Sequence, residues 1–532
     1  MTTPPKSVFE QPAAGTITHD EMPPGYRPPQ DDRGFFGHPR GLSTLFFTEM
    51  WERFSYYGLR PLLVLFMTAA LTQGGFAFER TEAASIVGIY AASVYLASLP
   101  GGWIADRILG LRRGIFWGAV LISLGHLSIG LSGFVHGKVA FFSGLILIVL
   151  GTGLLKPNIS AIVGDLYPEG GARRDAGFSV FYMGINSGAF FGQIVTGALG
   201  EAVGWHWGFG AAGVGMLIGL ITYAIRAPRT LGHLGVEISR HPDPVIQARQ
   251  MSRAKVALTA GVVILVAVIV LAATGVITIN PVAVASSMTY VLVGLAVLYF
   301  GYIFSAGGLS TNEKKRVVVI MILFVFSAIF WAAFEQAPTS LNLFARDFTN
   351  RSIGGFEVPA TWFQSINSAF IIILAPVFGA IWLWMARRGW ELSSLAKFAL
   401  GLAFAGIGFF LMLVPSNALV AANGAIKVSP WWLTISYFFQ SCGELSLSPV
   451  GLSSMTKLSP RKYVGQMMGI WFLATSVGNL IAGLVGGSVD PEKLEQTPKL
   501  FLGTTVALGI AAVVIALLAI PVRKMMRGEG ET

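Results

Sequence analysis

Four ionisable residues stand within one long apolar stretch, residues 42–70: Glu49, Glu52, Arg53 and Arg60. On a helix that advances 100° per residue, these four and Tyr56 share a stripe roughly 100° wide, and the opposite face is apolar. A charge at the centre of a bilayer costs at least ~2.5–3.5 kcal/mol, so in a membrane the stripe must face a hydrated interior. Either a proton-binding cluster in a cavity or a structural ion-pair ladder between helices fits this pattern.

Three further ionisable residues interrupt apolar stretches. Lys156 precedes Pro157 and Asn158, Glu335 stands in Phe-Glu-Gln, and Glu444 follows Cys-Gly. A lysine beside a helix-breaking proline is typical of a cavity with freed backbone carbonyls, although its side chain could also extend to the membrane surface. The two lone glutamates are candidate proton or cation sites, or protonated residues of helix packing.

These charges are distributed asymmetrically along the chain. Arg60 and Lys156 fall in its first half, and Glu335 and Glu444 in its second half. A ligand bound between the two halves would meet positive charge on one side and negative charge on the other, which suits a zwitterion. A buried carboxyl near an arginine can also exchange a proton near neutral pH.

Aromatic and amide side chains within the apolar stretches add candidate binding groups, with packing or membrane-interface roles as the alternative. They are Tyr57, Tyr95, Asn186, Trp331, Asn367 and Trp471. The chain has one cysteine and seven scattered histidines, so we expect no disulfide framework and no metal site.

The composition indicates the elements that must position these residues. Of 532 residues, 54% are apolar and 12% charged, against roughly 25% charged in soluble domains. About fourteen stretches are long enough to span a bilayer. They are 42–70, 82–105, 114–134, 139–163, 177–199, 206–226, 255–275, 282–305, 317–344, 360–386, 393–414, 430–456, 463–486 and 500–522. The pattern predicts an all-α polytopic membrane protein.

Basic residues predict its orientation. Lys and Arg are concentrated in the loops after even-numbered segments, which places those loops and both termini in the cytoplasm. The net charge of +10 therefore belongs to the inner membrane surface, and we expect no nucleic-acid partner.

The segments divide into two sixes around an insert. Residues 229–312 hold a basic loop and two spans without ionisable residues, typical of scaffold or lipid-facing helices. We therefore expect six-helix bundles at 41–228 and 313–525, flanked by a flexible tail at 1–40 and a short tail at 526–532. Two six-helix halves are typical of secondary transporters.

The sequence also resembles a known family. Residues 49–58, Glu-Met-Trp-Glu-Arg-Phe-Ser-Tyr-Tyr-Gly, resemble the ExxERFxYYG signature of the proton-coupled oligopeptide transporters of the major facilitator superfamily. Further similar motifs are 101–107, 156–158, 181–186, 334–336, 443–444 and 448–449. The resemblance covers roughly 40–525, and the two plain helices resemble the extra pair of bacterial members.

The resemblance implies symport of di- and tripeptides with protons across the bacterial inner membrane by alternating access. It also implies a monomer that needs no cofactor besides the proton. Carried over, Arg60 and Lys156 hold the peptide carboxylate. Asn186, Asn367 and Glu444 hold the amino end. Side-chain pockets are lined by Tyr57, Tyr95, Trp331, Trp471 and Ser448. The proton is coupled by Glu49, Glu52, Arg53 and Glu335.

The same resemblance implies two gates. Glu335 facing Arg60 would close the outer one, and Lys156 with Glu444 the inner one. One motif departs from the family, because Ser-Gly-Ala-Phe at 187–190 replaces a common Gly-Ser-Leu. A transporter of another solute on the same fold, such as nitrate or a peptide-like drug, is the alternative function. A membrane enzyme is disfavoured, because we find no metal-ligand cluster and no large loop between helices. A channel is disfavoured because the charges form dispersed pairs and not rings.

Overall fold

The computed structural model of the chain describes residues 32–134, 137–168, 171–238, 243–390 and 392–526. Residues 1–31 and 527–532, which make up most of the two predicted tails, lie outside the described residues.

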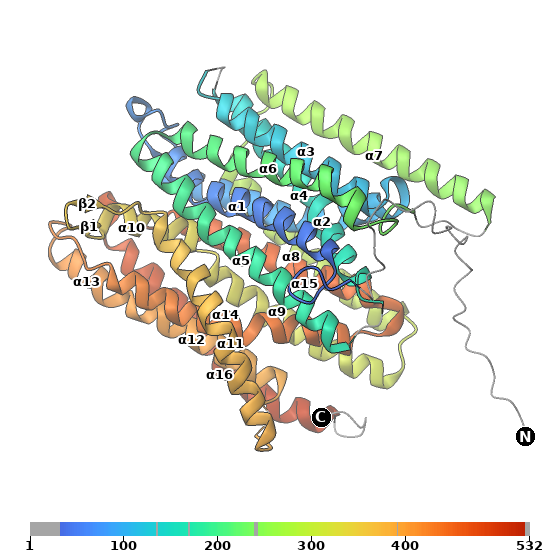
Figure 1. The fold of residues 1–532 in the computed structure, drawn as a ribbon. Helices are drawn as coiled ribbons and strands as arrows, with labels where there is room; N and C mark the ends of the chain where they lie inside the picture. The colour runs from blue at the N-terminus through green and yellow to red at the C-terminus, as the bar shows by residue number, and fades with distance from the viewer. Residues whose placement is uncertain (1–31, 135–136, 169–170, 239–242, 391, 527–532) are drawn as a thin grey trace, which may run out of the picture.

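Helices dominate the described chain (Figure 1). The first six are α1 (Arg40–Thr68), α2 (Arg80–Ile104), α3 (Leu111–Leu131), α4 (Gly137–Asp165), α5 (Gly171–Ala202) and α6 (Trp205–Thr230). Two more follow, α7 (Pro244–Ala273) and α8 (Pro281–Ala306). The last group is α9 (Thr311–Phe334), α10 (Asn342–Phe348), α11 (Trp362–Arg387), α12 (Ser394–Leu411), α13 (Leu413–Ala421), α14 (Trp431–Leu458), α15 (Val464–Gly486) and α16 (Gln496–Met526). A short hairpin, β1 (Ser352–Ile353) and β2 (Phe356–Glu357), joins α10 to α11.

The long helices agree with the predicted spans. Among the described residues, fourteen helices have at least 18 residues, and each overlaps one predicted apolar segment. Eleven helical segments in the same part of the chain are long and apolar enough to cross a membrane. The other three long helices, α1, α5 and α14, carry ionisable or many polar residues, which lowers their mean hydropathy. The α1 charge cluster, Asn186 and Glu444 lie in these three helices, whereas Lys156 and Asn367 lie in two of the apolar helices, α4 and α11.

The helices before α7 and those after α8 each pack mainly among themselves. In the first group α1 packs on α5 and α6, and α3 on α4; in the second, α12 packs on α14 and α16, and α9 on α15. The two groups meet where α2 lies on α15 and α5 on α11. The end of the molecule that holds Thr68 of α1 is called the outer end below, and the end that holds Arg40 the inner end.

Close backbone approach explains one of these contacts. A Cβ added to Gly88 of α2 would lie 2.7 Å from the carbonyl oxygen of Asn479 and 2.9 Å from Cα of Gly483, both on α15. Only glycine allows the two helices to cross at this distance. This crossing brings α15 next to the polar stripe of α1.

The helix that carries Glu335 is interrupted. The sequence predicted one segment over 317–344, but α9 ends at Phe334, and a π-helical turn over Ala337–Leu341 precedes α10. Pro338 in this turn cannot donate a backbone hydrogen bond. Glu335 therefore lies in the break between α9 and the π-helical turn. Short π-helical insertions of this kind are frequent at functional sites.

Two other expectations differ from the structure. Pro157 does not break α4, which is continuous from Gly137 to Asp165. The last residues of the predicted tail are packed, because Asp32 and His38 are 5% and 8% exposed. The Asp32 backbone carbonyl accepts a hydrogen bond from Arg173 at 2.7 Å, and the His38 ring bonds the Tyr167 hydroxyl at 2.9 Å. Residues 32–39 thus cover the inner ends of α4 and α5.

The two inserted helices differ from each other. The apolar window of α7 is not buried at all, and Figure 1 shows this helix along the edge of the molecule. Helix α8 packs against both α2 and α15, so it lies over the contact between the two groups.

Candidate functional site

The predicted charge cluster of α1 exists as a buried group. Nε of Arg53 lies 3.1 Å from Oε1 of Glu49, and the same guanidinium pairs with Glu52. The three side chains are at most 3% exposed. From α4, the Thr152 hydroxyl donates a hydrogen bond of 3.4 Å to Glu52, and the Arg53 guanidinium lies over the Tyr56 ring, 5.2 Å from its centroid. The Arg53 guanidinium thus forms ion pairs with two carboxylates, those of Glu49 and Glu52, away from bulk water.

A second buried pair connects the two helix groups. Arg60 of α1 donates through Nη2 to the carboxylate of Glu335, at the break after α9. The same nitrogen donates to Oδ1 of Asn479 on α15 at 2.8 Å. The amide of Asn479 is itself fixed, because its Nδ2 donates to the Thr475 carbonyl at 2.9 Å. Breaking such a buried pair by removing one partner typically costs about 3–5 kcal/mol.

The second predicted pair, Lys156 with Glu444, is not formed in this structure. The Lys156 ammonium lies over the Tyr95 ring, 4.1 Å from its centroid. Within the part of the chain that the structure describes, Lys156 and Glu444 form no ion pair with each other. The structure therefore combines a formed Arg60–Glu335 contact with separated Lys156 and Glu444.

The remaining predicted groups lie on helices α1, α5, α9, α11, α14 and α15. Asn367 donates to the Ser441 hydroxyl at 2.8 Å, and Asn186 donates to the Tyr182 carbonyl of its own helix at 3.0 Å. These bonds fix both amides. The hydroxyl of Ser448 is buried without a partner in the described chain.

The predicted aromatic residues differ in burial. Trp471 is 6% exposed and lies against α14, where a Cβ on Gly451 would overlap its ring at 2.1 Å. Trp331 is half-buried, and its indole N–H has no partner among the described residues. Tyr57 is half-buried on α1 beside Tyr56, with ring centroids 5.1 Å apart. Unused donors on buried or half-buried side chains can bind a polar ligand.

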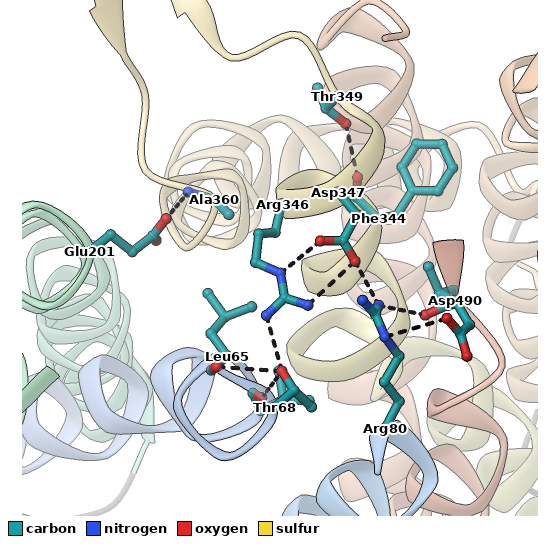
Figure 2. Close-up of polar contacts among 12 residues, drawn as sticks. Leu65, Thr68, Arg80, Glu201, Phe344, Arg346, Asp347, Thr349, Ala360 and Asp490 are labelled. Carbon is teal, nitrogen blue, oxygen red and sulfur yellow. Dashed lines mark hydrogen bonds and ion pairs between the residues drawn. The ribbon is translucent and has the colours of Figure 1, made fainter. Parts of the chain in front are cut away.

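Figure 2 shows a polar network at the outer end. Arg80, at the start of α2, pairs with Asp347 of α10 at 2.6 Å and with Asp490 at 3.8 Å. Arg346 also pairs with Asp347, at 2.8 Å, and donates to the Thr68 hydroxyl of α1 at 3.0 Å. The network links the outer ends of α1 and α2 to α10.

A second outer contact joins α5 to α11. The Glu201 carboxylate accepts hydrogen bonds from the backbone N–H of Ala360 at 2.8 Å and of Thr361 at 3.0 Å, and from the Thr361 hydroxyl at 2.8 Å. Arg351 lies 3.6 Å from the same carboxylate. An anion at the N-terminus of a helix is stabilised by its unpaired N–H groups. Two polar contacts thus join the helix groups at the outer end, and the Arg60–Glu335 pair lies eight residues deeper along α1.

The comparisons agree with this arrangement. A sequence profile described as the POT family matches residues 112–500. The chain belongs to the POT family. It is 48% identical over 497 residues to "Peptide transporter YePEPT" of Yersinia enterocolitica, covering 93% of this chain and 96% of that protein. It is 36% identical over 509 residues to a "Di-/tripeptide transporter" of Lactococcus lactis, covering 93% and 98%.

The fold is also found among solved structures. A crystal structure of peptide transporter POT in complex with sulfate matches with a TM-score of 0.85 and 40% identity, covering 93% of this chain and 98% of the other. The predicted fold class is confirmed: this POT-family chain is an all-α membrane transporter with the major facilitator fold, two six-helix bundles and two helices inserted between them.

Sequence reasoning missed several residues that the structure brings into the site. Asn479 lies 419 positions from Arg60, and its only signal is an amide within an apolar stretch. Glu201, Arg80 and Asp347 stand near predicted span ends, where charged residues are ordinary. Their partners became visible only when the helices were placed together.

Proposed function

We propose that this chain is a proton-coupled symporter that imports di- and tripeptides by alternating access. The observation that carries the proposal is the arrangement of charge between the two bundles, with Arg60 and Lys156 on one side and Glu444 on the other. A short peptide is a zwitterion of this polarity. The printed names of the Yersinia and Lactococcus relatives support the same substrate class.

We assign the two ends of the peptide to opposite bundles. Arg60 and Lys156 bind the carboxylate; Asn186, Asn367 and Glu444 bind the amino end. The side chains of the peptide contact Tyr57, Tyr95, Trp331, Trp471 and Ser448. In the present conformation Lys156 rests on Tyr95 and Arg60 is held by Glu335, so binding must first release Arg60.

Charge balance supports a proton site on α1. With both carboxylates ionised, Glu49, Glu52 and Arg53 carry a net charge of −1, which either the nearby Lys156 ammonium or one bound proton neutralises. A buried group that can become neutral by binding one proton favours that step over retaining a net charge. Protonation here, and on Glu335, weakens the hold on the guanidinium groups and frees Arg60 for the peptide.

The two gates follow from the same pairs. Arg60 with Glu335 closes the outer side, and Lys156 with Glu444 closes the inner side. The formed outer pair and the separated inner pair support assigning this structure to a state open toward the inner end.

The wider assignment is as follows. The chain acts as a monomer in the bacterial inner membrane, with both termini and the inner end facing the cytoplasm; it is not an enzyme and uses no cofactor except the proton. The bundles span 41–228 and 313–525, and 229–312 forms the inserted loop and helix pair. The segments 1–40 and 526–532 flank the bundles, and residues 32–39 of the first segment pack on the inner ends of α4 and α5.

The coupling role is tested with Glu52→Gln in liposomes. We expect the variant to lose dipeptide uptake driven by an inward-acid pH gradient but to keep exchange of labelled for unlabelled dipeptide, since exchange needs no net proton movement. Glu357→Gln, whose carboxylate is 73% exposed on the hairpin, is the matched control and should keep both activities. A Glu52→Gln variant that retains driven uptake contradicts the assignment.

A further inference from the structure

A hollow on the outside of the bundle has no role in the transport site. It has a volume of about 370 Å³ and lies between α1 and α6. Its lining consists of Phe47, Trp51, Ile221, Thr222, Ile225 and Arg226. Trp51 belongs to the same helix as Glu49 and Glu52 but faces the opposite way, toward the membrane.

The hollow is built into the packing of α1 against α6. A Cβ on Gly219 would lie 2.9 Å from Cβ of Trp51, and one on Gly215 would lie 3.3 Å from the indole ring. These glycines allow the indole to lie close to the α6 backbone. Ile221 and Ile225, which form the opposite wall, are 49% and 55% exposed and so present apolar surface outward. The indole N–H of Trp51 has no hydrogen-bond partner among the described residues.

The positive end of the hollow lies at the depth of lipid headgroups. Trp205 begins α6 at the outer end, and Arg226 follows 21 residues later, about 32 Å along the helix. This distance is close to the ~30 Å thickness of the hydrocarbon core. With Trp205 at one membrane interface, where tryptophan is enriched, Arg226 therefore lies at the other. The apolar walls then lie at the depth of acyl chains.

The guanidinium of Arg226 is held in place. Its Nη2 donates to the Ser43 hydroxyl of α1 at 2.7 Å. Arg229, one turn further toward the inner end on the same side of α6, is exposed. Two cationic side chains with fixed-geometry donors match a phosphate group, which guanidinium binds through paired hydrogen bonds.

We propose that the hollow between α1 and α6 binds one anionic phospholipid of the inner-side leaflet. One acyl chain lies along Phe47, Trp51, Ile221 and Ile225, and the phosphate binds Arg226 and Arg229. The indole N–H of Trp51 is the additional donor in the hollow that can bind an oxygen of this lipid. The lipid thus packs against the back of the helix that carries the charge cluster.

The test measures retention of a defined lipid by the purified full-length protein. The protein is incubated with phosphatidylglycerol or with phosphatidylcholine of the same chains, and bound lipids are counted by native mass spectrometry. We expect one phosphatidylglycerol to be retained in preference to phosphatidylcholine. Arg226→Gln/Arg229→Gln should reduce that population at least about tenfold, since the loss of even one charge-assisted hydrogen bond is worth about that factor.

Two further variants make the test specific. Arg387→Gln/Arg388→Gln removes the same charge from the end of α11 and should leave retention unchanged. Trp51→Leu keeps every charge and should weaken retention. Equal retention of the two lipids, an equal loss in the α11 control, or full retention by Trp51→Leu would overturn the proposal, because each indicates general attraction to a basic surface. Melting temperatures in lipid-free detergent, matched to the wild type, exclude misfolding as the cause of a loss.

Discussion

Glu201→Gln should open the outer end of the molecule. The Glu201 carboxylate at the end of α5 accepts hydrogen bonds from two backbone N–H groups and one hydroxyl at the start of α11, at 2.8, 3.0 and 2.8 Å. Any state in which the outer ends of the two bundles separate must break these bonds and return the carboxylate to water. The contact therefore stabilises the outward-closed state selectively.

The expected magnitude follows from the bonds. Each hydrogen bond to a charged group contributes roughly 1.5–3 kcal/mol when it is shielded from solvent. Gln keeps one acceptor oxygen, loses the charge, and turns an NH2 toward N–H donors. Because Glu201 is 14% exposed, solvent screens part of the interaction. We therefore expect a loss of about 2 kcal/mol, a factor of roughly 30, which would change a 99:1 closed population to about 3:1.

The assay is a distance measurement between spin labels. Labels at Thr72→Cys and Ser352→Cys report on the outer ends of the two bundles, since both residues are exposed there. The single native cysteine, Cys442, is first replaced by Ser. Glu201→Gln should add a longer distance to the distribution.

The matched control is Glu357→Gln. Glu357 also pairs with Arg351, at 2.8 Å, but it is 73% exposed, and among the described residues it accepts no hydrogen bond from the Ala360 and Thr361 N–H groups that precede α11. Its distance distribution should equal that of the wild type. The same distribution in Glu201→Gln, or an equal change in the control, would refute the reasoning that capping of α11 by the other bundle stabilises closure.

Three further predictions concern other contacts. Asn479→Ala removes the second partner of Arg60 and should increase the longer outer distance roughly tenfold in population, for a loss of about 1.5 kcal/mol; unchanged spin-label distances would contradict this. Glu444→Gln should weaken the inhibition of labelled-dipeptide uptake by unlabelled dialanine about tenfold or more. The weaker inhibition by N-acetylated dialanine, which has no free amino group, should not change. Equal losses of inhibition by both compounds would exclude contact between Glu444 and the amino end. Burial, and then the charges of Arg173 and Arg33, lower the pKa of His38 below its usual 6.5, so the neutral ring contributes stability above pH 6.5 that is lost as the pH falls. The melting temperature of His38→Gln should therefore fall less than that of the wild type between about pH 6.5 and 5. Melting temperatures that fall equally in the two proteins would contradict this prediction.

Much of the fold could be predicted because a helix that spans a bilayer requires about 20 mostly apolar residues, which are easily found in a sequence. Each long helix coincides with an apolar stretch, and the short basic loops separate them. The break after α9 was not predicted, although Pro338 lies in it, because proline alone does not locate a break: α4 continues through Pro157. The packing of residues 32–39 was hidden for a related reason, since a polar, proline-rich composition describes a tail whether or not it folds back.

The candidate site could be predicted where the signal lies within one helix. The spacing of Glu49, Glu52 and Arg53 alone places them on one face, and they lie in contact. Contacts between helices were beyond such reasoning. Asn479 reaches Arg60 only because Gly88 and Gly483 allow α2 and α15 to cross closely, a condition that no local pattern expresses.

The most direct test of the central claim is uptake of a labelled dipeptide by liposomes that hold the wild-type protein. The account predicts accumulation above the external concentration when the outside is acidic, and only equilibration after a protonophore collapses the gradient. Uptake that is equal with and without the gradient would contradict proton coupling. No dipeptide uptake by protein that is shown to be folded would contradict the assigned substrate.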